Sequence, residues 1–242
     1  MIPYRLRSAC FLLALLPLTP ATAGIDPAAR TLVEASAAKL AAAKTIQLTA
    51  KHELEAPLGG DGKLDKGPLQ LTVKRPNLIH VLQSAGEETR EMAFDGRTLC
   101  VLHPNLRHHA LETVKATSIS QFGDQIDARF GFRPPLAELL AEDMAAQLFL
   151  HVTEAKVVGR ERVGWTQCDR LHFVQEGMSF DLWIGVKDKL PRRLQFTFTE
   201  ITGQPVWDLR MSKWVLDGPV DDALFSRRPA ADSSQVKMLR AK

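Results

Sequence analysis

Apolar and polar residues alternate with a period of two along most of the chain, which is the pattern of β-strands with one buried face. In residues 46–54, for example, Leu48, Ala50 and His52 alternate with polar neighbours. The other predicted strands cover residues 69–73, 78–82, 91–94, 98–102, 108–112, 152–158, 167–174, 178–184, 193–198 and 207–215. Tight turns join most of them, including an Asp95-Gly96 hairpin signal. The strands are therefore expected to form an antiparallel sheet.

Helical periodicity appears at the start and in the middle of the chain. Asp26 is a good helix cap and Pro27 is tolerated at the first helical position, so a helix is predicted from there to residue 43. Two more helices are predicted at 118–130 and 135–150. They are the obvious cover for the apolar sheet face, and a long antiparallel sheet twists and curls. We predict an α+β fold in which a strongly curved antiparallel sheet holds helices in its concavity.

A cleavable secretory signal peptide is predicted at residues 1–23. Arg5 and Arg7 are its only charged residues, residues 8–18 are apolar, and a small-residue cleavage site ends at Ala23. The apolar run is shorter than the about 20 residues that span a bilayer, which disfavours the alternative of an uncleaved anchor. Cleavage after Ala23 implies a periplasmic location and lowers the formal net charge from +3 to +1. Such a balanced chain has no electrostatic signature for nucleic acid or for an anionic membrane.

Two cysteines, Cys100 and Cys168, remain after Cys10 leaves with the signal peptide. An oxidising compartment permits a disulfide between them. The alternative is two buried thiols on different strands, because free cysteine packs as a small hydrophobe. Residues 230–242 are small and polar and are predicted to be a disordered tail, which leaves one domain at residues 24–229.

No motif for catalysis or metal binding is recognisable. The nearest approach to a metal cluster is His103, His108 and His109, but adjacent strand residues point to opposite faces. No zinc-type spacing and no nucleophile elbow occurs. Glu138 and Glu142, one helical turn apart, are interpreted as a solvated helix surface. The sequence thus predicts a protein that is not an enzyme and has no metal or cofactor.

A resemblance to known proteins rests on five segments. They are Lys74-Arg75-Pro76-Asn77-Leu78, Phe94-Asp95-Gly96-Arg97-Thr98-Leu99, Asp181-Leu182-Trp183-Ile184, Leu190-Pro191-Arg192-Arg193-Leu194 and Asp222-Ala223-Leu224-Phe225. In their order and spacing they resemble the lipoprotein-localisation-factor (LolA/LolB-like) superfamily, and within it a family of predicted periplasmic proteins of unknown function. The resemblance covers roughly residues 25–229. It implies an unclosed half-barrel whose mouth is plugged by helices and which encloses an apolar cavity.

The apolar strand residues expected on the concave face are the candidates for lining such a cavity. They are Leu48, Leu71, Val73, Leu171, Phe173, Met178, Phe180, Leu182, Leu194, Phe196, Phe198, Trp207, Leu209 and Met211. A packed core beneath the helices explains the same pattern equally well. We predict a soluble, monomeric periplasmic carrier of a hydrophobic or amphiphilic ligand, such as a lipid or an acylated protein. The alternative is an envelope protein-binding or sensory module that engages a membrane partner without carrying lipid.

Overall fold

The computed structural model describes residues 24–58 and 62–241, so the predicted signal peptide and its cleavage site lie outside the described residues. The strands are β1 (Thr45–Leu54), β2 (Asp65–Lys74), β3 (Leu78–Ala85), β4 (Glu88–Phe94), β5 (Thr98–His103), β6 (His108–Thr113), β7 (Val152–Val163), β8 (Thr166–Gln175), β9 (Met178–Gly185), β10 (Pro191–Phe198), β11 (Val206–Leu216) and β12 (Ser234–Gln235). The helices are α1 (Pro27–Ala41), α2 (Ile119–Phe130), α3 (Ala137–Leu140) and α4 (Met144–Phe149). Short 3₁₀-helices lie at η1 (Ala56–Leu58), η2 (Pro104–Leu106) and η3 (Asp222–Leu224).

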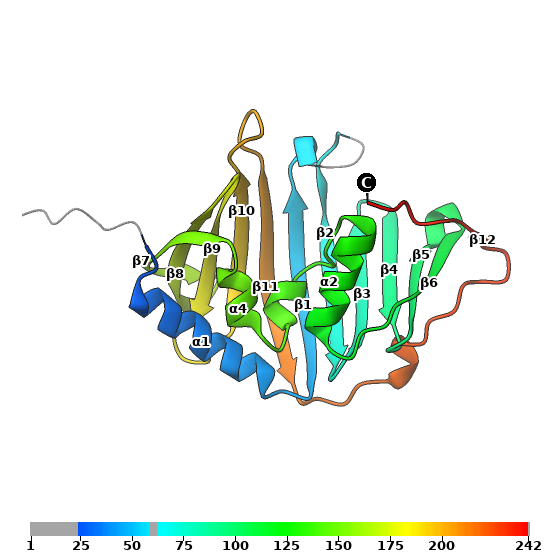
Figure 1. Ribbon diagram of the computed structural model, residues 1–242, viewed down its shortest axis with the longest axis horizontal. Helices are drawn as coiled ribbons and strands as arrows, with labels where there is room; N and C mark the ends of the chain where they lie inside the picture. Colours follow the sequence, from blue (N-terminus) through cyan, green and yellow to red (C-terminus); the bar gives the residue numbers. More distant parts are fainter. Residues whose placement is uncertain (1–23, 59–61, 242) are drawn as a thin grey trace, which may run out of the picture.

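All twelve strands belong to one sheet, in the order β12-β6-β5-β4-β3-β2-β1-β11-β10-β9-β8-β7. Every neighbouring pair is antiparallel except β12 and β6, which run parallel. The two edge strands, β12 and β7, are not paired with each other in the described part of the chain. The sheet is therefore a curved, unclosed half-barrel, as predicted, with the four helices lying against one side of it (Figure 1).

The first helix begins where the sequence predicts. The Asp26 carboxylate accepts a hydrogen bond of 2.8 Å from the Ala28 backbone, and Pro27 occupies the first turn. This cap satisfies a backbone donor that has no partner inside the helix. The face that carries Val33 and Leu40 is fully buried, so α1 is held by tertiary packing along one side.

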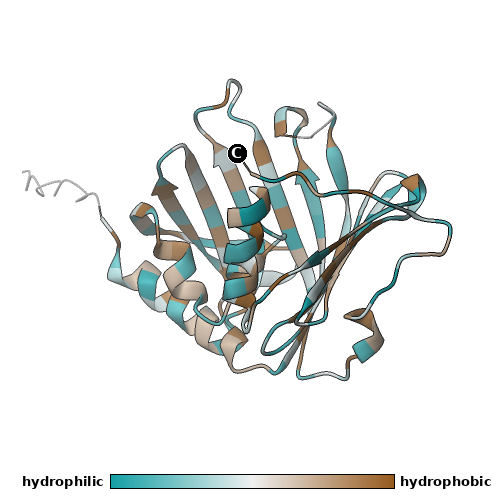
Figure 2. Cartoon of the chain, turned by 45° about the vertical axis from the view of Figure 1, so that its right-hand side comes forward, coloured by the Kyte–Doolittle hydropathy of each residue, from teal (hydrophilic) through white to brown (hydrophobic). Residues whose placement is uncertain are grey.

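Strand register places the alternating apolar residues on the helix-covered face. Leu48 lies opposite Leu71, and Leu171 lies opposite Leu182, and all four are buried. The hydropathy colouring shows apolar bands on strands behind the helices (Figure 2). The main core therefore lies between the concave sheet face and the helices, which is the arrangement that the period-two pattern predicts.

The second central helix differs from the prediction because it is broken into α3 and α4. Leu136 adopts a left-handed conformation before α3, and Ala141 leaves helical geometry after it. The break lets the Glu142 carboxylate accept hydrogen bonds from the backbone of Ile119 at 3.1 Å and Ser120 at 3.2 Å, at the start of α2. A carboxylate there satisfies free amide groups and the positive end of the helix. The interpretation of Glu142 as part of a solvated helix surface is therefore wrong, because its carboxylate binds the start of α2.

The two cysteines do not form a disulfide. Cys100 on β5 and Cys168 on β8 are both free and buried. Seven strands separate β5 from β8 in the sheet, and neighbouring strands lie about 4.8 Å apart, so the Cα separation that a disulfide needs is not met. The alternative of two buried thiols is the one that the structure adopts.

The tail also differs from the prediction of disorder. Residues 230–241 follow a defined path in which β12 pairs with the free edge of β6. Ser234 donates to the Arg107 carbonyl and Val236 to the His109 carbonyl, each at 2.8 Å. An edge strand presents unpaired backbone groups, and the tail satisfies them through its main chain. Because main-chain groups make this pairing, the polar side chains of the tail do not predict it.

Candidate ligand pocket on the concave face

A row of aromatic rings crosses the concave face from β8 to β11. Register pairs Phe173 with Phe180, Phe180 with Phe196, and Phe196 with Trp207. The ring centroids are 4.5, 5.7 and 5.5 Å apart along this row. Phe149 of α4 lies 5.8 Å from Phe173, so helix α4 covers the β8 end. The row is buried at Phe173 and Phe180 and becomes half-exposed at Phe196 and Trp207.

A pocket of about 200 Å³ lies where the helices stop covering this row. Its sheet side is apolar and consists of Met178, Leu194, Phe196, Phe198, Trp207 and Leu209. The segment that leads into α3 closes it with Arg133, Pro134 and Leu136. Ligand pockets for small molecules usually measure about 300–1,000 Å³. A long apolar chain therefore fits only if the helices move outward.

The pocket has one charged edge, formed by Arg133 and Glu138. Their side chains are 3.7 Å apart, and Arg133 is also paired with Asp124 at 2.8 Å and Asp127 at 3.2 Å. Burial raises the pKa of Glu138 above its ordinary value, and Arg133 offsets only part of that rise. An apolar floor with a polar edge is the surface that an amphiphilic molecule complements.

The raised pKa of Glu138 predicts a pH-dependent stability. A carboxyl group whose pKa is higher in the folded state destabilises the fold progressively as the pH rises from the unfolded-state pKa, about 4.3, through the folded-state pKa. Glu138→Gln is expected to raise the melting temperature at about pH 7 and to leave it unchanged below the ordinary pKa of glutamate. Thermal melts across this pH range measure the difference. Glu34→Gln, at an exposed position on α1, is the matched control for the loss of one glutamate carboxylate. An equal gain at both ends of the pH range would contradict the assignment.

A partly buried polar network lies next to the pocket floor, on β1 to β4. His52 is opposite Leu209 in the sheet, and its Nε2 is 2.7 Å from an oxygen of Asp65. The other oxygen of Asp65 accepts from Arg90 at 3.0 Å, and the Gln83 amide lies 3.1 Å from the same His52 nitrogen. His52 Nδ1 is buried without a hydrogen-bond partner among the described residues. The apolar row that ends on Leu209 therefore meets a polar boundary at β1.

The predicted cavity residues fall into two groups. Six of the fourteen line the pocket, and they are Met178, Leu194, Phe196, Phe198, Trp207 and Leu209. The other eight are buried in the core, and they are Leu48, Leu71, Val73, Leu171, Phe173, Phe180, Leu182 and Met211. The period-two pattern places residues on a face but does not tell which of them the helices cover. Leu194 and Leu209 are buried in the core as well, so pocket lining and core packing overlap on this face.

The sequence pattern missed the polar residues around the pocket. Arg133 and Glu138 belong to the helical insertion, which is the segment between β6 and β7 that contains α2, α3 and α4. Asp65 and Arg90 lie on strands that are far from β9–β11 in the sequence. The alternation of β1 did place His52 on the inward face. In the described part of the chain, no group of three or more side chains is arranged to hold a metal ion.

Comparison with known proteins identifies the family. The DUF2092 family, described as "Predicted periplasmic protein", matches residues 29–239. The chain belongs to this family. The match spans the half-barrel and the tail, and it confirms the family resemblance that the sequence suggested. A search of curated proteins found no match. Within the described residues, none of the helices has the length and apolar character to cross a membrane.

Three solved structures are similar to this DUF2092 protein at low sequence identity. An uncharacterised conserved protein from Thermus thermophilus is 12% identical, with 87% of this chain and 99% of that chain covered and a TM-score of 0.52. A LolA superfamily protein from Nitrosomonas europaea is 14% identical, with 82% and 97% covered and a TM-score of 0.33. The MucA/MucB complex from Pseudomonas aeruginosa is matched at 18% identity, with 86% and 63% covered and a TM-score of 0.49. At these identities the likeness concerns the fold alone.

Proposed function

We propose that this protein is a non-catalytic periplasmic carrier that binds the apolar chain of an amphiphile in the concave pocket. The observation that carries the proposal is the aromatic row, which continues from the packed core into an accessible apolar floor at Phe196 and Trp207. Burial of each methylene group on this floor contributes about 0.8 kcal/mol. The charged edge of Arg133 and Glu138 lies where a polar head group remains near water. The family's description as periplasmic supports the location.

The helical insertion is the element that must move to admit a long chain. Arg75, at the end of β2, holds it closed: its guanidinium donates to the Leu140 carbonyl at 3.0 Å and pairs with Glu142 at 2.9 Å. Glu142 in turn caps α2. This pair, which we call the Arg75–Glu142 latch, ties the sheet, α2 and the α3–α4 segment together. The pocket opens when the latch releases.

Glu142→Ala is expected to speed the entry and exit of a fluorescent fatty-acid probe. The substitution removes the carboxylate that accepts from the first amides of α2 and pairs with Arg75, but it leaves the Ser118 N-cap and the apolar floor intact, so the rates should rise more than the equilibrium affinity changes. Loss of a helix cap costs about 1 kcal/mol, which the fold tolerates. Stopped-flow fluorescence measures the rates, and hydrogen exchange in α2 measures the loosening. Glu34→Ala is the control, because Glu34 forms only an exposed pair with Arg30 at 3.9 Å. Unchanged entry rates would refute the latch.

Native mass spectrometry of protein purified from the periplasm tests the carrier function directly. A co-purified lipid, together with saturable uptake of a fluorescent fatty acid, is the expected result. Protein that is consistently free of lipid and takes up no probe would rule the carrier function out. If such protein also retained one envelope protein stoichiometrically, the alternative of a protein-binding module would replace it.

A further inference from the structure

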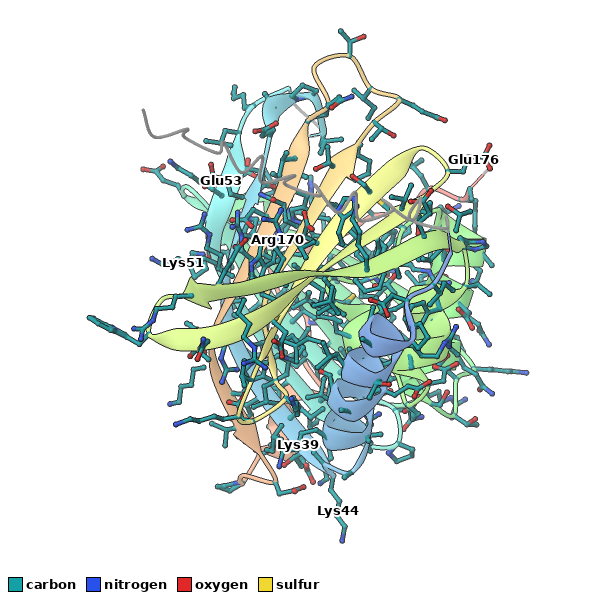
Figure 3. The ribbon with its side chains drawn as sticks, turned by 90° about the vertical axis from the view of Figure 1, so that its left-hand side faces the viewer. Lys39, Lys44, Lys51, Glu53, Arg170 and Glu176 are labelled. Atoms are coloured by element: carbon teal, nitrogen blue, oxygen red, sulfur yellow. The ribbon has the colours of Figure 1, made fainter. Side chains whose placement is uncertain are left out.

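A row of cations crosses the convex face of the sheet, on the side opposite the pocket. Register pairs Arg170 with Trp183, Trp183 with Arg193, Arg193 with Arg210, and Arg210 with Lys51, over five neighbouring strands from β8 to β1. Figure 3 views the molecule from its β7–β8 side and labels Arg170 and Lys51. The guanidinium groups of Arg170 and Arg193 lie 5.1 and 4.7 Å from the Trp183 ring.

The row places like charges directly opposite one another. Such pairs destabilise a sheet unless carboxylates neutralise them. Asp208 is shared between Arg193 at 2.5 Å and Arg210 at 2.6 Å, so one carboxylate serves two arginines. Lys51, the next cation in the row, has no carboxylate partner among the described residues. Positive charge therefore accumulates at the β11–β1 end of the row.

A groove of about 530 Å³ lies at this end, between the β7–β8 hairpin and strands β10, β11 and β1. Its cations are Lys51, Arg162, Arg192, Arg193 and Arg210, and no carboxylate lines it. Arg192 is paired with Asp188, whereas Arg162 has no such partner in the described part of the chain. Asp208 and Asp188 neutralise part of this charge, but the five groove cations outnumber these two carboxylates, and the near-neutral net charge of the chain does not show that local excess.

The tip of the hairpin carries a fully exposed tryptophan. Trp165 is 96% exposed and lines the groove together with the cations. Val163 and Met211 also line the groove, but Trp165 remains 96% exposed, so packing among the described residues does not explain this large apolar side chain in water. Tryptophan is enriched at the level of lipid head groups, where one end of the ring meets water.

We propose that the groove and Trp165 form a docking surface for a bilayer that contains anionic phospholipids. Arginine and lysine in the groove meet the lipid phosphates, and Trp165 enters the head-group region. A protein partner is disfavoured, because aromatic anchors of protein interfaces lie inside packed apolar patches, whereas Trp165 is 96% exposed and lines a groove with five cations. This surface is independent of the concave pocket, so each proposal stands or falls by itself.

Co-sedimentation with vesicles of phosphatidylglycerol and phosphatidylcholine tests the proposal, with pure phosphatidylcholine vesicles for comparison. We expect binding to the anionic vesicles alone, weakening as salt is raised. Each cation near an anionic surface contributes about fivefold to partitioning, so Lys51→Gln with Arg162→Gln should weaken binding about 25-fold. Trp165→Ala should also weaken binding and should remove a blue shift of the tryptophan fluorescence. All three side chains are exposed, so the variants should fold normally.

The matched control is Lys39→Gln with Lys44→Gln, which removes two exposed cations from the end of α1 and the residues after it. It should retain vesicle binding. Binding that is absent, equal for both vesicle types, or lost equally in the control overturns the proposal. Binding of polyglutamate without vesicle binding, and without dependence on Trp165, also overturns it and points to an acidic protein segment instead. Fatty-acid uptake should be unchanged in every variant, which separates this test from that of the carrier function.

Discussion

Replacing Phe196 with glutamate is expected to lower the affinity for an acyl-chain probe by more than about 100-fold. Phe196 lies in the middle of the pocket floor, between Phe180 at 5.7 Å and Trp207 at 5.5 Å. A bound chain would force the new carboxylate either to lose its water or to take up a proton. Protonation at about pH 7 costs about 3.7 kcal/mol for a group with an ordinary pKa of about 4.3, and burying the charge costs several kcal/mol. A tenfold change in affinity corresponds to about 1.4 kcal/mol.

Phe196→Leu is the matched control for this experiment, because it keeps the floor apolar. Its affinity should remain within several-fold of the natural protein, and titration of a fluorescent fatty acid measures both variants. The glutamate in the empty pocket stays in contact with water, so the fold of Phe196→Glu should persist and circular dichroism can check it. Equal affinities for the two variants would show that the ligand does not contact this floor.

Truncation of Phe173 to alanine is expected to cause the largest loss of stability among single changes in the aromatic row. Phe173 is fully buried, stacks on Phe180 at 4.5 Å and contacts Phe149 of α4. Removal of a buried phenylalanine ring typically costs about 3–5 kcal/mol, because a cavity remains where the ring was. For a domain of this size that corresponds to a fall in melting temperature of about 6–20 °C. Denaturant unfolding with two probes measures the free energy.

Trp165→Ala removes an even larger ring and serves as the comparison. Trp165 is 96% exposed, so its loss should change the free energy of unfolding by no more than about 0.5 kcal/mol. The contrast tests whether the row from Phe149 to Trp207 is a continuous core element that ends in a pocket. A small effect of Phe173→Ala would mean that the helices do not pack on this row.

The Arg75–Glu142 latch and the pocket floor are expected to control two different properties of a carrier, the rate of ligand entry and the affinity for the ligand. The floor determines how strongly an apolar chain is held, since burial free energy scales with the buried area. The Arg75–Glu142 latch is expected to determine how often the insertion opens, because it joins the insertion to the sheet through an ion pair and a hydrogen bond. Variants of the floor are therefore expected to change affinity, whereas variants of the latch are expected to change rates.

The sequence predicted the strands and their inward faces well, for a simple physical reason. Alternation along a strand records which side meets water, and that information is local. The inward position of Leu48, the Asp26 cap of α1 and the Asp95-Gly96 hairpin all follow from neighbouring residues. The Asp95 carboxylate accepts from the backbone of Arg97 and Thr98 at 2.9 and 2.6 Å, which completes that turn locally.

Contacts between distant segments decided the features that the sequence pattern did not predict. The helix predicted at 135–150 is divided into α3 and α4, because Glu142 accepts a hydrogen bond from the start of α2 and forms an ion pair with Arg75, which follows β2. The tail is ordered because β6 has a free edge, and the two cysteines stay apart because seven strands separate them. None of these partners is close in sequence.

The amino-acid pattern alone is sufficient to predict a curved sheet with one apolar face and helices that cover it. It did not determine where that cover ends, and so could not tell a ligand pocket from a filled core. The tertiary structure was needed to show that Phe173 lies under α4 while the half-exposed Phe196 and Trp207 line the pocket. Only strand register brought Arg193, Arg210 and Lys51 into one row. Burial of a face is a property of each strand, whereas the limits of that burial depend on segments that are far apart in the chain.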